Sequence, residues 1–173
     1  MVSNEEISVN KRNGRGKESL NIEKIHSMVG FATEGITGVS ASHVEMNSGI
    51  QFFDGVSTAD IQQILIKSAN DLITLENPNY QYVAARLLLF QLRKQLFHRL
   101  WDHPKFIDHI KTLIDKGLYD KDILVNYDES EIDRMGMWID HERDYNFTYA
   151  GLRQVMDKYL VQDRSTGDIF ETP

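Results

Sequence analysis

The chain has 173 residues, of which 41% are hydrophobic and 26% charged, the ordinary balance of a soluble globular protein. Its formal net charge of −7 argues against general nucleic-acid binding, and the absence of cysteine excludes disulfides, zinc ribbons and a redox-active dithiol in this chain. No apolar run reaches the roughly 20 residues of a membrane span, and the polar start is no signal peptide. We therefore expect no membrane association and a cytoplasmic location.

The first half of the sequence predicts a hairpin followed by four helices. Ile7 and Val9 alternate with polar residues before Asn13-Gly14, which tolerates the positive φ of a tight turn, so residues 6–20 are expected to form a β-hairpin. The helices are expected from Asn21 to Gly35, from Ser40 or Ser42 towards Gly49, from a Ser57 cap with Asp60 at the capping-box position, and from Asn77-Pro78 through the segment 83–90. Because that last segment is apolar almost all round, its helix should lie in the middle of a bundle.

The second half predicts further helices and a second hairpin. Periodic apolar residues mark a helix over 106–114, Asp128 with Glu131 caps the next, and Thr148 begins one that reaches Tyr159. Strands at 159–161 and 169–171 are expected to flank a turn, the last with nothing to pack on. The predicted fold is mainly α: a hairpin-plus-four-helix unit over residues 5–97, then a helical unit over 98–173 that ends in a β-hairpin.

Sequence signatures of catalysis and of metal binding are missing. The string from Gly14 to Lys17 lacks the spacing of a phosphate-cradling loop. The string from His141 to Asp144 lacks the second histidine that a helical zinc motif needs. We therefore assign no catalytic residue and no metal ligand.

Basic residues from separate elements indicate a binding site for a compact polyanion. The hairpin, the first helix and the fourth helix contribute Lys11, Arg12, Lys24 and Lys94, which could converge on a triphosphate. The start of the third helix would add backbone N–H groups and the Thr58 hydroxyl, while Glu18 and Asn21 could bind an adenine edge. From spacing alone, solvated lysines and a capping asparagine explain these residues better.

Several long strings carry a family resemblance. The strings Lys11–Gly14, Leu20–Ile25, Ile50–Gly55, Thr58–Ile61 and Pro78–Arg86 resemble the ATP-cone, an allosteric module of many ribonucleotide reductases. Further strings resemble the region after the cone in the class I large subunit: Tyr119-Asp120, Ile139–Asp144, Phe147–Tyr149 and Lys158–Val161. The resemblance implies a four-helix bundle capped by a small sheet that binds ATP or dATP, with Mg²⁺, as an allosteric effector.

The same resemblance implies which residues contact the nucleotide. Phosphates would be bound by Lys11, Arg12, Lys24, Thr58 and Lys94. The stretch that wraps the nucleotide, with its first and fourth residues near adenine, would be Glu18, Ser19, Leu20, Asn21, Ile22, Glu23 and Lys24. Phe90 would line the site. Gln62 replaces a histidine found in members that dATP inhibits strongly, and Phe31 replaces a common tryptophan, so nucleotide binding is expected more firmly than inhibition by dATP.

The resemblance also implies partners. In the family, ribonucleoside diphosphates are reduced by cysteines in a ten-stranded barrel, so this cysteine-free chain is not expected to be active alone. Expected partners are the barrel-bearing remainder of the large subunit and the small radical-generating subunit, in an oligomeric holoenzyme, with neither nucleic acid nor membrane. The chain is either a piece of a longer protein or the first product of a split gene. The alternative function is a helical assembly module that docks to reductase subunits without binding nucleotide.

Overall fold

The computed structural model describes residues 8–10, 16–49 and 55–173. Contacts divide the chain into two compact units. The first holds the described residues up to Leu88 together with Thr148–Ala150, and the second holds Leu89–Phe147 and Gly151–Pro173. The helix that contains Leu88 and Leu89 contributes to both units, and the domain boundary after residue 97 stays a prediction.

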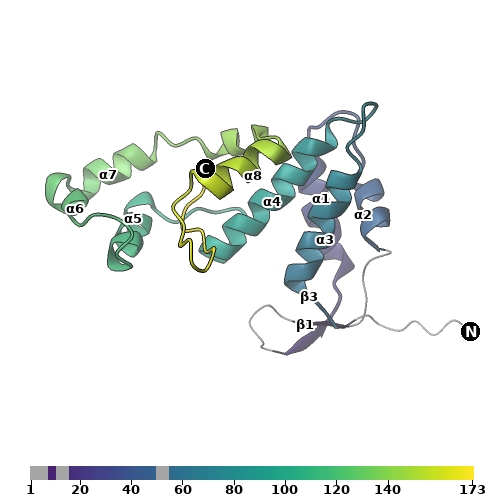
Figure 1. The fold of residues 1–173 in the computed structure, drawn as a ribbon, viewed down its shortest axis with the longest axis horizontal. Helices are drawn as coiled ribbons and strands as arrows, with labels where there is room; N and C mark the ends of the chain where they lie inside the picture. Colours follow the sequence, from purple (N-terminus) through teal and green to yellow (C-terminus); the bar gives the residue numbers. More distant parts are fainter. Residues whose placement is uncertain (1–7, 11–15, 50–54) are drawn as a thin grey trace, which may run out of the picture. The chain divides into compact units, whose positions relative to one another are not determined.

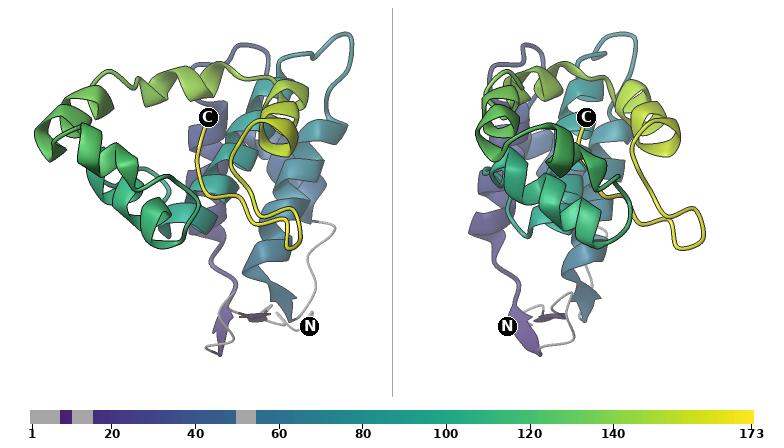
Figure 2. Two further views of the ribbon diagram at one scale, coloured as in Figure 1. Left: turned by 60° about the vertical axis from the view of Figure 1, so that its left-hand side comes forward. Right: turned by 90° about the vertical axis from the view of Figure 1, so that its left-hand side faces the viewer.

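A small three-stranded sheet lies at one end of the helices of the first unit (Figures 1 and 2). Its strands are β1 (Ser8–Asn10), β2 (Lys17–Ser19) and β3 (Val56–Ser57), in the order β2-β1-β3. The antiparallel β1–β2 pair confirms the expected hairpin, although its Asn13-Gly14 turn lies outside the described residues. The parallel strand β3 was not predicted, because two residues carry no period.

The helices of the first unit follow the sequence closely. They are α1 (Ile22–Thr33), α2 (Ala41–Gly49), α3 (Thr58–Asp71) and the first half of α4 (Tyr80–Phe97). Asn21 caps α1 and Ser57 forms a capping box with Asp60 at the start of α3, both as predicted. The expected start of α4 at Asn77-Pro78 is wrong by two residues, because the carbonyls of Pro78 and Asn79 accept three-residue turn bonds from Gln81 and Tyr82.

Polar side chains connect α4 to the elements around it in the first unit. The Tyr80 hydroxyl accepts from the Ser40 backbone N–H at 3.0 Å, and Arg86 Nη1 donates to the Glu34 carbonyl at 2.6 Å. In the helix interior Val83, Ala84 and Leu87 are fully buried. The unit is therefore mainly helical around a buried α4 segment, and the specific four-helix-bundle arrangement stays a prediction.

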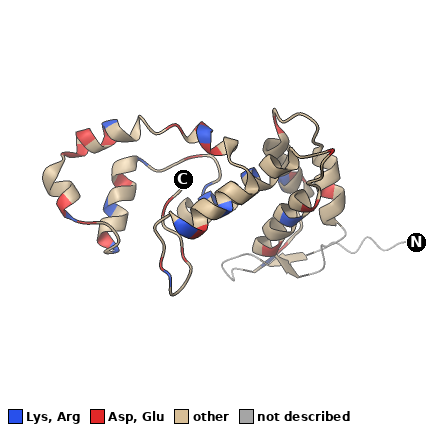
Figure 3. Ribbon diagram, turned by 45° about the horizontal axis from the view of Figure 1, so that its top comes forward, with Lys and Arg blue, Asp and Glu red and all other residues tan. Residues whose placement is uncertain are grey.

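The second unit contains the rest of α4 and five more helical segments. They are α5 (Phe106–Asp115), α6 (Asp122–Asn126), α7 (Glu129–Gly136), the 3₁₀ segment η1 (His141–Asn146) and most of α8 (Tyr149–Lys158). The helices α5, α7 and α8 were predicted; α6 and η1 were missed, because segments this short show little periodicity. Acidic and basic residues follow one another along α5 and α7 (Figure 3). Among the described residues, no helix has the length and hydropathy to cross a membrane.

The expected C-terminal hairpin is reduced to one bridge. Gln162 pairs with Ile169 in an isolated bridge. Between them, the Asp163 N–H donates a hydrogen bond to the Asp168 carbonyl at 2.8 Å, which closes the turn. The expectation that the last segment has nothing to pack on is wrong. Glu171 accepts from the Tyr119 hydroxyl at 2.5 Å and from the Val161 N–H at 2.8 Å, so a side chain replaces further strand pairing.

A buried ion pair joins α4 to η1 inside the second unit. Arg93 is only 1% exposed and donates from Nη2 to Asp144 Oδ2 at 3.0 Å and from Nη1 to the Tyr145 hydroxyl at 2.8 Å. Burial raises the pKa of Asp144, and the Arg93 guanidinium opposes that rise. Neither charge would be tolerated here without the other.

Arg93→Ala should therefore destabilise the protein by about 3–5 kcal/mol, because it leaves a buried carboxylate without its cation. Urea unfolding at pH 7 measures the change. The double variant Arg93→Met with Asp144→Leu should recover most of the loss, since it removes both charges.

The matched control is Lys67→Ala, which removes the exposed Lys67–Asp71 pair on α3 and should cost less than about 1 kcal/mol. An Arg93→Ala protein that unfolds like Lys67→Ala would contradict a structural role for the buried pair.

Candidate functional site

The sheet register places three polar residues side by side at one edge. Lys17 on β2 pairs with Asn10 on β1, which in turn pairs with Ser57 on β3. Since β1 and β3 are parallel, their carboxyl ends share this edge. In sequence, β1 continues into Lys11 and Arg12, two expected phosphate ligands that lie outside the described residues, and β3 continues into Thr58.

Lys17 and Asn10 were not predicted as site residues. The sequence shows Lys17 as one of several basic residues near the hairpin, and only the pairing places it opposite Asn10. Asn10 is anchored there, because its Nδ2 donates to the Gly55 carbonyl at 2.6 Å while the Gly55 N–H donates to the Ser8 carbonyl at 2.8 Å. The hairpin register was the signal that could have revealed both residues.

The start of α3 offers hydrogen-bond donors to an anion. The capping box uses the N–H of Asp60, which donates to Ser57 Oγ at 3.0 Å. The backbone N–H groups of Thr58 and Ala59 take no part in this capping box. They lie next to the Thr58 hydroxyl. A helix start with such groups favours negative charge. The Asp60 carboxylate belongs to the cap, accepting from the Ser57 hydroxyl at 2.6 Å.

The stretch from Glu18 to Lys24 leads from β2 into the first turn of α1. Asn21 Oδ1 accepts from the Lys24 N–H at 2.9 Å, so the capping role is confirmed and leaves only the amide nitrogen of Asn21 to donate elsewhere. Ile22, on the first turn of α1, is 71% exposed. Ser19, Glu23 and Lys24 are exposed, whereas Glu18 and Leu20 are half-buried.

Gln62 lies one turn after Thr58 but is only 5% exposed. Its Nε2 donates to the Leu87 carbonyl on α4 at 2.8 Å. The side chain therefore makes a buried contact between α3 and α4, which uses one of the two N–H donors of its amide. Phe31, which replaces a common tryptophan of the family, lies on α1 and is half-exposed.

Phe90 and Lys94 follow on α4 within the second unit. Phe90 is buried there, with its ring edge-to-face against Trp101 at 5.0 Å and against Tyr145 at 6.3 Å. Lys94 is exposed and has an interaction of its own. The roles of both residues at a nucleotide stay predictions, because they belong to the unit that does not contain the sheet.

Taken together, the sheet edge and the two helix starts form a surface suited to a phosphorylated ligand with an aromatic base. Lys17 and Lys24 supply cations, the start of α3 supplies N–H groups, and Ile22 supplies an exposed apolar face.

The comparison with protein families identifies the same region. Residues 7–95, just over half of the chain, match the family model described as the ATP cone domain. That span includes the sheet, α1–α3 and most of α4.

Curated relatives match nearly the whole chain. The chain is 44% identical over 169 residues to "Ribonucleoside-diphosphate reductase 1 subunit alpha" of Escherichia coli and 45% identical over 169 residues to the subunit alpha of Haemophilus influenzae, covering 98% of the chain and 22% of each relative. The subunit alpha of Enterobacteria phage T4 is 42% identical over 167 residues, again with 22% of its length covered. The chain thus spans about a fifth of the length of these relatives. It belongs to the ATP-cone family and is similar, over nearly its whole length, to the N-terminal region of class I ribonucleotide reductase alpha subunits.

Proposed function

We propose that the chain is the ATP- or dATP-binding regulatory part of a ribonucleoside-diphosphate reductase alpha subunit. One observation carries the proposal: in a chain of the ATP-cone family, the parallel β1–β3 pair brings the end of β1 to the start of α3. That arrangement brings Lys17, Asn10 and the donors around Thr58 to one edge of the sheet. Converging cations and helix N–H groups are what a triphosphate requires.

The phosphates would be bound at this edge. Thr58 would donate its hydroxyl and backbone N–H, and Lys24 and the newly identified Lys17 would supply charge. Lys11 and Arg12, which follow β1 in sequence, and Lys94 on α4 complete the proposed set. A lysine acts here as a flexible point charge, so several lysines can follow the nucleotide without fixed geometry.

The base would lie against the stretch from Glu18 to Glu23. Ile22, which is exposed, would cover one face of the adenine. Glu18 would accept from the exocyclic amine, and the amide nitrogen of Asn21 would donate to a ring nitrogen. Ser19 and Leu20 would follow the sugar, and Phe90 would line the site from α4.

Mg²⁺ would enter with the nucleotide rather than through a dedicated protein site. This ion keeps several of its waters and commonly binds substrate phosphates. The carboxylate at the start of α3 belongs to Asp60, which the capping box already uses. The phosphates themselves would therefore supply most of the ligands that are not water.

The proposed partners are a barrel-bearing chain or segment and a small radical-generating subunit, in an oligomeric cytoplasmic enzyme. The relatives are alpha subunits about five times as long as the matched region and would carry the catalytic barrel outside it. The competing function, an assembly module without a nucleotide, predicts that the same edge of the sheet binds nothing.

ATP with Mg²⁺ should raise the melting temperature of the chain. At 100 times the dissociation constant the added stability is about 2.7 kcal/mol. Lys24→Ala should remove most of the shift while leaving the melting temperature of the free protein unchanged, because Lys24 is an exposed side chain. Differential scanning calorimetry with and without nucleotide measures both quantities.

Lys67→Ala is the matched control, since it removes an exposed helical lysine on α3 outside the proposed site. It should leave the ATP shift intact. If saturating ATP moves no melting temperature and titration calorimetry detects no binding heat, the assembly-module function replaces the proposed one.

The chain alone should not reduce a ribonucleoside diphosphate, because it contains no cysteine to carry a thiyl radical or to act as the reducing pair. Activity should require a barrel-bearing chain and the small subunit. Deoxyribonucleotide formation by the pure chain, measured with radiolabelled substrate, would contradict this assignment.

Both nucleotides should bind, but dATP should inhibit the assembled reductase weakly. ATP and dATP differ by one ribose hydroxyl, so opposite responses need groups near that sugar. Gln62 directs its amide nitrogen to the Leu87 carbonyl, and Phe31 lacks the indole N–H and the larger face of tryptophan.

The assay measures the activity of the reconstituted complex as the concentration of dATP rises. A second effector is present at saturation, so that any other effector site of the complex is occupied throughout. Gln62→His combined with Phe31→Trp should increase inhibition, whereas Phe31→Tyr is the control that adds neither imidazole nor indole. Strong inhibition of the unmodified complex, accompanied by larger oligomers, would show that the prediction is wrong.

A further inference from the structure

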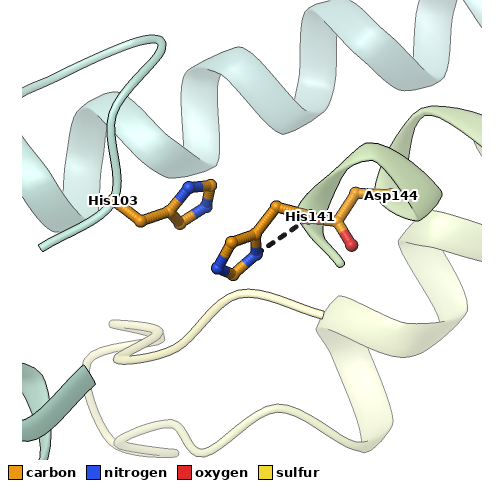
Figure 4. Close-up of side chains that lie close together, drawn as sticks. All are labelled: His103, His141 and Asp144. Atoms are coloured by element: carbon orange, nitrogen blue, oxygen red, sulfur yellow. Dashed lines mark ion pairs between the residues drawn. The ribbon is translucent and has the colours of Figure 1, made fainter. Parts of the chain in front are cut away.

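Three potential metal ligands lie close together in the second unit. His103 lies in the segment between α4 and α5, and His141 and Asp144 lie on η1. Each offers one donor atom, and these atoms lie within 4.8 Å of one another (Figure 4). No metal ligand was predicted from the sequence, because no second histidine lies at helical zinc-motif spacing from His141. The fold supplies that histidine from a distant segment.

The two imidazoles have unsatisfied nitrogens. Their rings stack face to face, with centroids 3.5 Å apart and an interplanar angle of 4°. His103 Nε2 and His141 Nδ1 are both buried, and neither has a hydrogen-bond partner in the described part of the chain. The nearest carboxylate oxygen, Asp144 Oδ2, is 3.8 Å from His141 Nδ1, which is too long for a hydrogen bond. A buried nitrogen without a partner destabilises the fold, and a bound ion would give it one.

The carboxylate is held in position by residues that would form the outer shell of a site. Arg93 Nη2 donates to Asp144 Oδ2 at 3.0 Å, and the same guanidinium donates to Tyr145. Ligating carboxylates in proteins are themselves hydrogen-bonded, which orients them. Two imidazoles and one carboxylate suit an ion that prefers imidazole, whereas Ca²⁺ and Mg²⁺ prefer oxygen ligands.

A modest rearrangement would complete the geometry. Ligands around a tetrahedral zinc ion, bound at about 2.0–2.1 Å, lie roughly 3.3 Å apart, so the donors would have to approach by about 1.5 Å. Two parallel rings cannot direct their lone pairs at one point, so one ring would have to rotate about its Cβ–Cγ bond, a soft torsion. Both histidines line a pocket of about 680 Å³, which gives room for this rotation and for water.

We propose that His103, His141 and Asp144 bind one transition-metal dication of the Zn²⁺ class, with water from the pocket as a further ligand. The ion would tie the segment between α4 and α5 to η1, which lie far apart in sequence. It would thereby stabilise the second unit.

The test uses the full 173-residue chain without an affinity tag, stripped of metal by a chelator. Co²⁺ is the probe, because its visible absorption reports the number and type of ligands. One Co²⁺ should bind per chain with the intense bands of a four-coordinate site, and Zn²⁺ should displace it. His103→Phe retains a stacking ring without a lone pair, so it should weaken Zn²⁺ binding at least tenfold and abolish the Co²⁺ bands.

His109→Phe is the matched control. His109 lines the same pocket, and like His103 its ring lies edge-to-face against Phe97, but it is not among the three ligands. It should bind Co²⁺ like the unmodified chain. Melting temperatures measured with chelator present verify that both variants fold. An unmodified chain that binds no Co²⁺, or a His103→Phe protein that binds like the His109→Phe protein, overturns the proposal.

Discussion

Helix α4 is apolar on nearly every side, and the need to cover it organises the described chain. From Val83 to Arg93 every side chain except those of Arg86 and Gln91 is buried. Burying one leucine contributes about 1.5–3 kcal/mol, and this segment buries four: Leu87, Leu88, Leu89 and Leu92. Its first half is covered within the first unit and its second half within the second. The loss of either cover would expose a continuous apolar surface, so each half of α4 depends on its own unit.

The same burial determines where the polar groups go. Arg93 is in the most buried part of α4 and requires a counterion, which Asp144 on η1 provides. Gln62 is buried against α4 and donates to the Leu87 carbonyl. These contacts are specific in direction, whereas apolar packing tolerates small rotations, so they help to fix which face of each helix meets α4. The ion pair between Arg93 and Asp144 also holds η1 against α4. It thereby positions His141 and Asp144 close to His103.

The proposed nucleotide site depends on the register of a very small sheet. A shift of β2 by one residue would replace Lys17 by Glu18 opposite Asn10, and a cation at the phosphate edge would become a carboxylate. Buried Val9 and Val56 pair across β1 and β3 and stabilise the register of those two strands. Gly55 adds to this, since its φ of +80° suits glycine and its N–H and carbonyl both bond to β1. Binding of a nucleotide at this edge therefore requires the apolar pairing behind it.

Local sequence determined the helices that have their own capping residues and a clear apolar period. The Asn21 cap, the Ser57–Asp60 and Asp128–Glu131 capping boxes and the 3.6-residue periods of α1, α3 and α5 need only neighbours within one or two turns. The candidate nucleotide residues came from the basic residues of separate elements and from the family resemblance, and among them the capping role of Asn21 is confirmed. Local sequence signals could not reveal three short elements: β3, α6 and η1. Such short segments are stabilised by the elements they pack against.

Tertiary structure decided everything that joins residues far apart in the sequence. It placed Lys17 and Asn10 beside the start of α3, committed the amide of Gln62 to α4, and put Phe90 into an aromatic core. It also brought His103 to His141, a pairing that no spacing predicts. The physical reason is the same in each case. Sequence period reports which face of an element is apolar, but the partner of a buried polar group is chosen by the packing of all the elements at once.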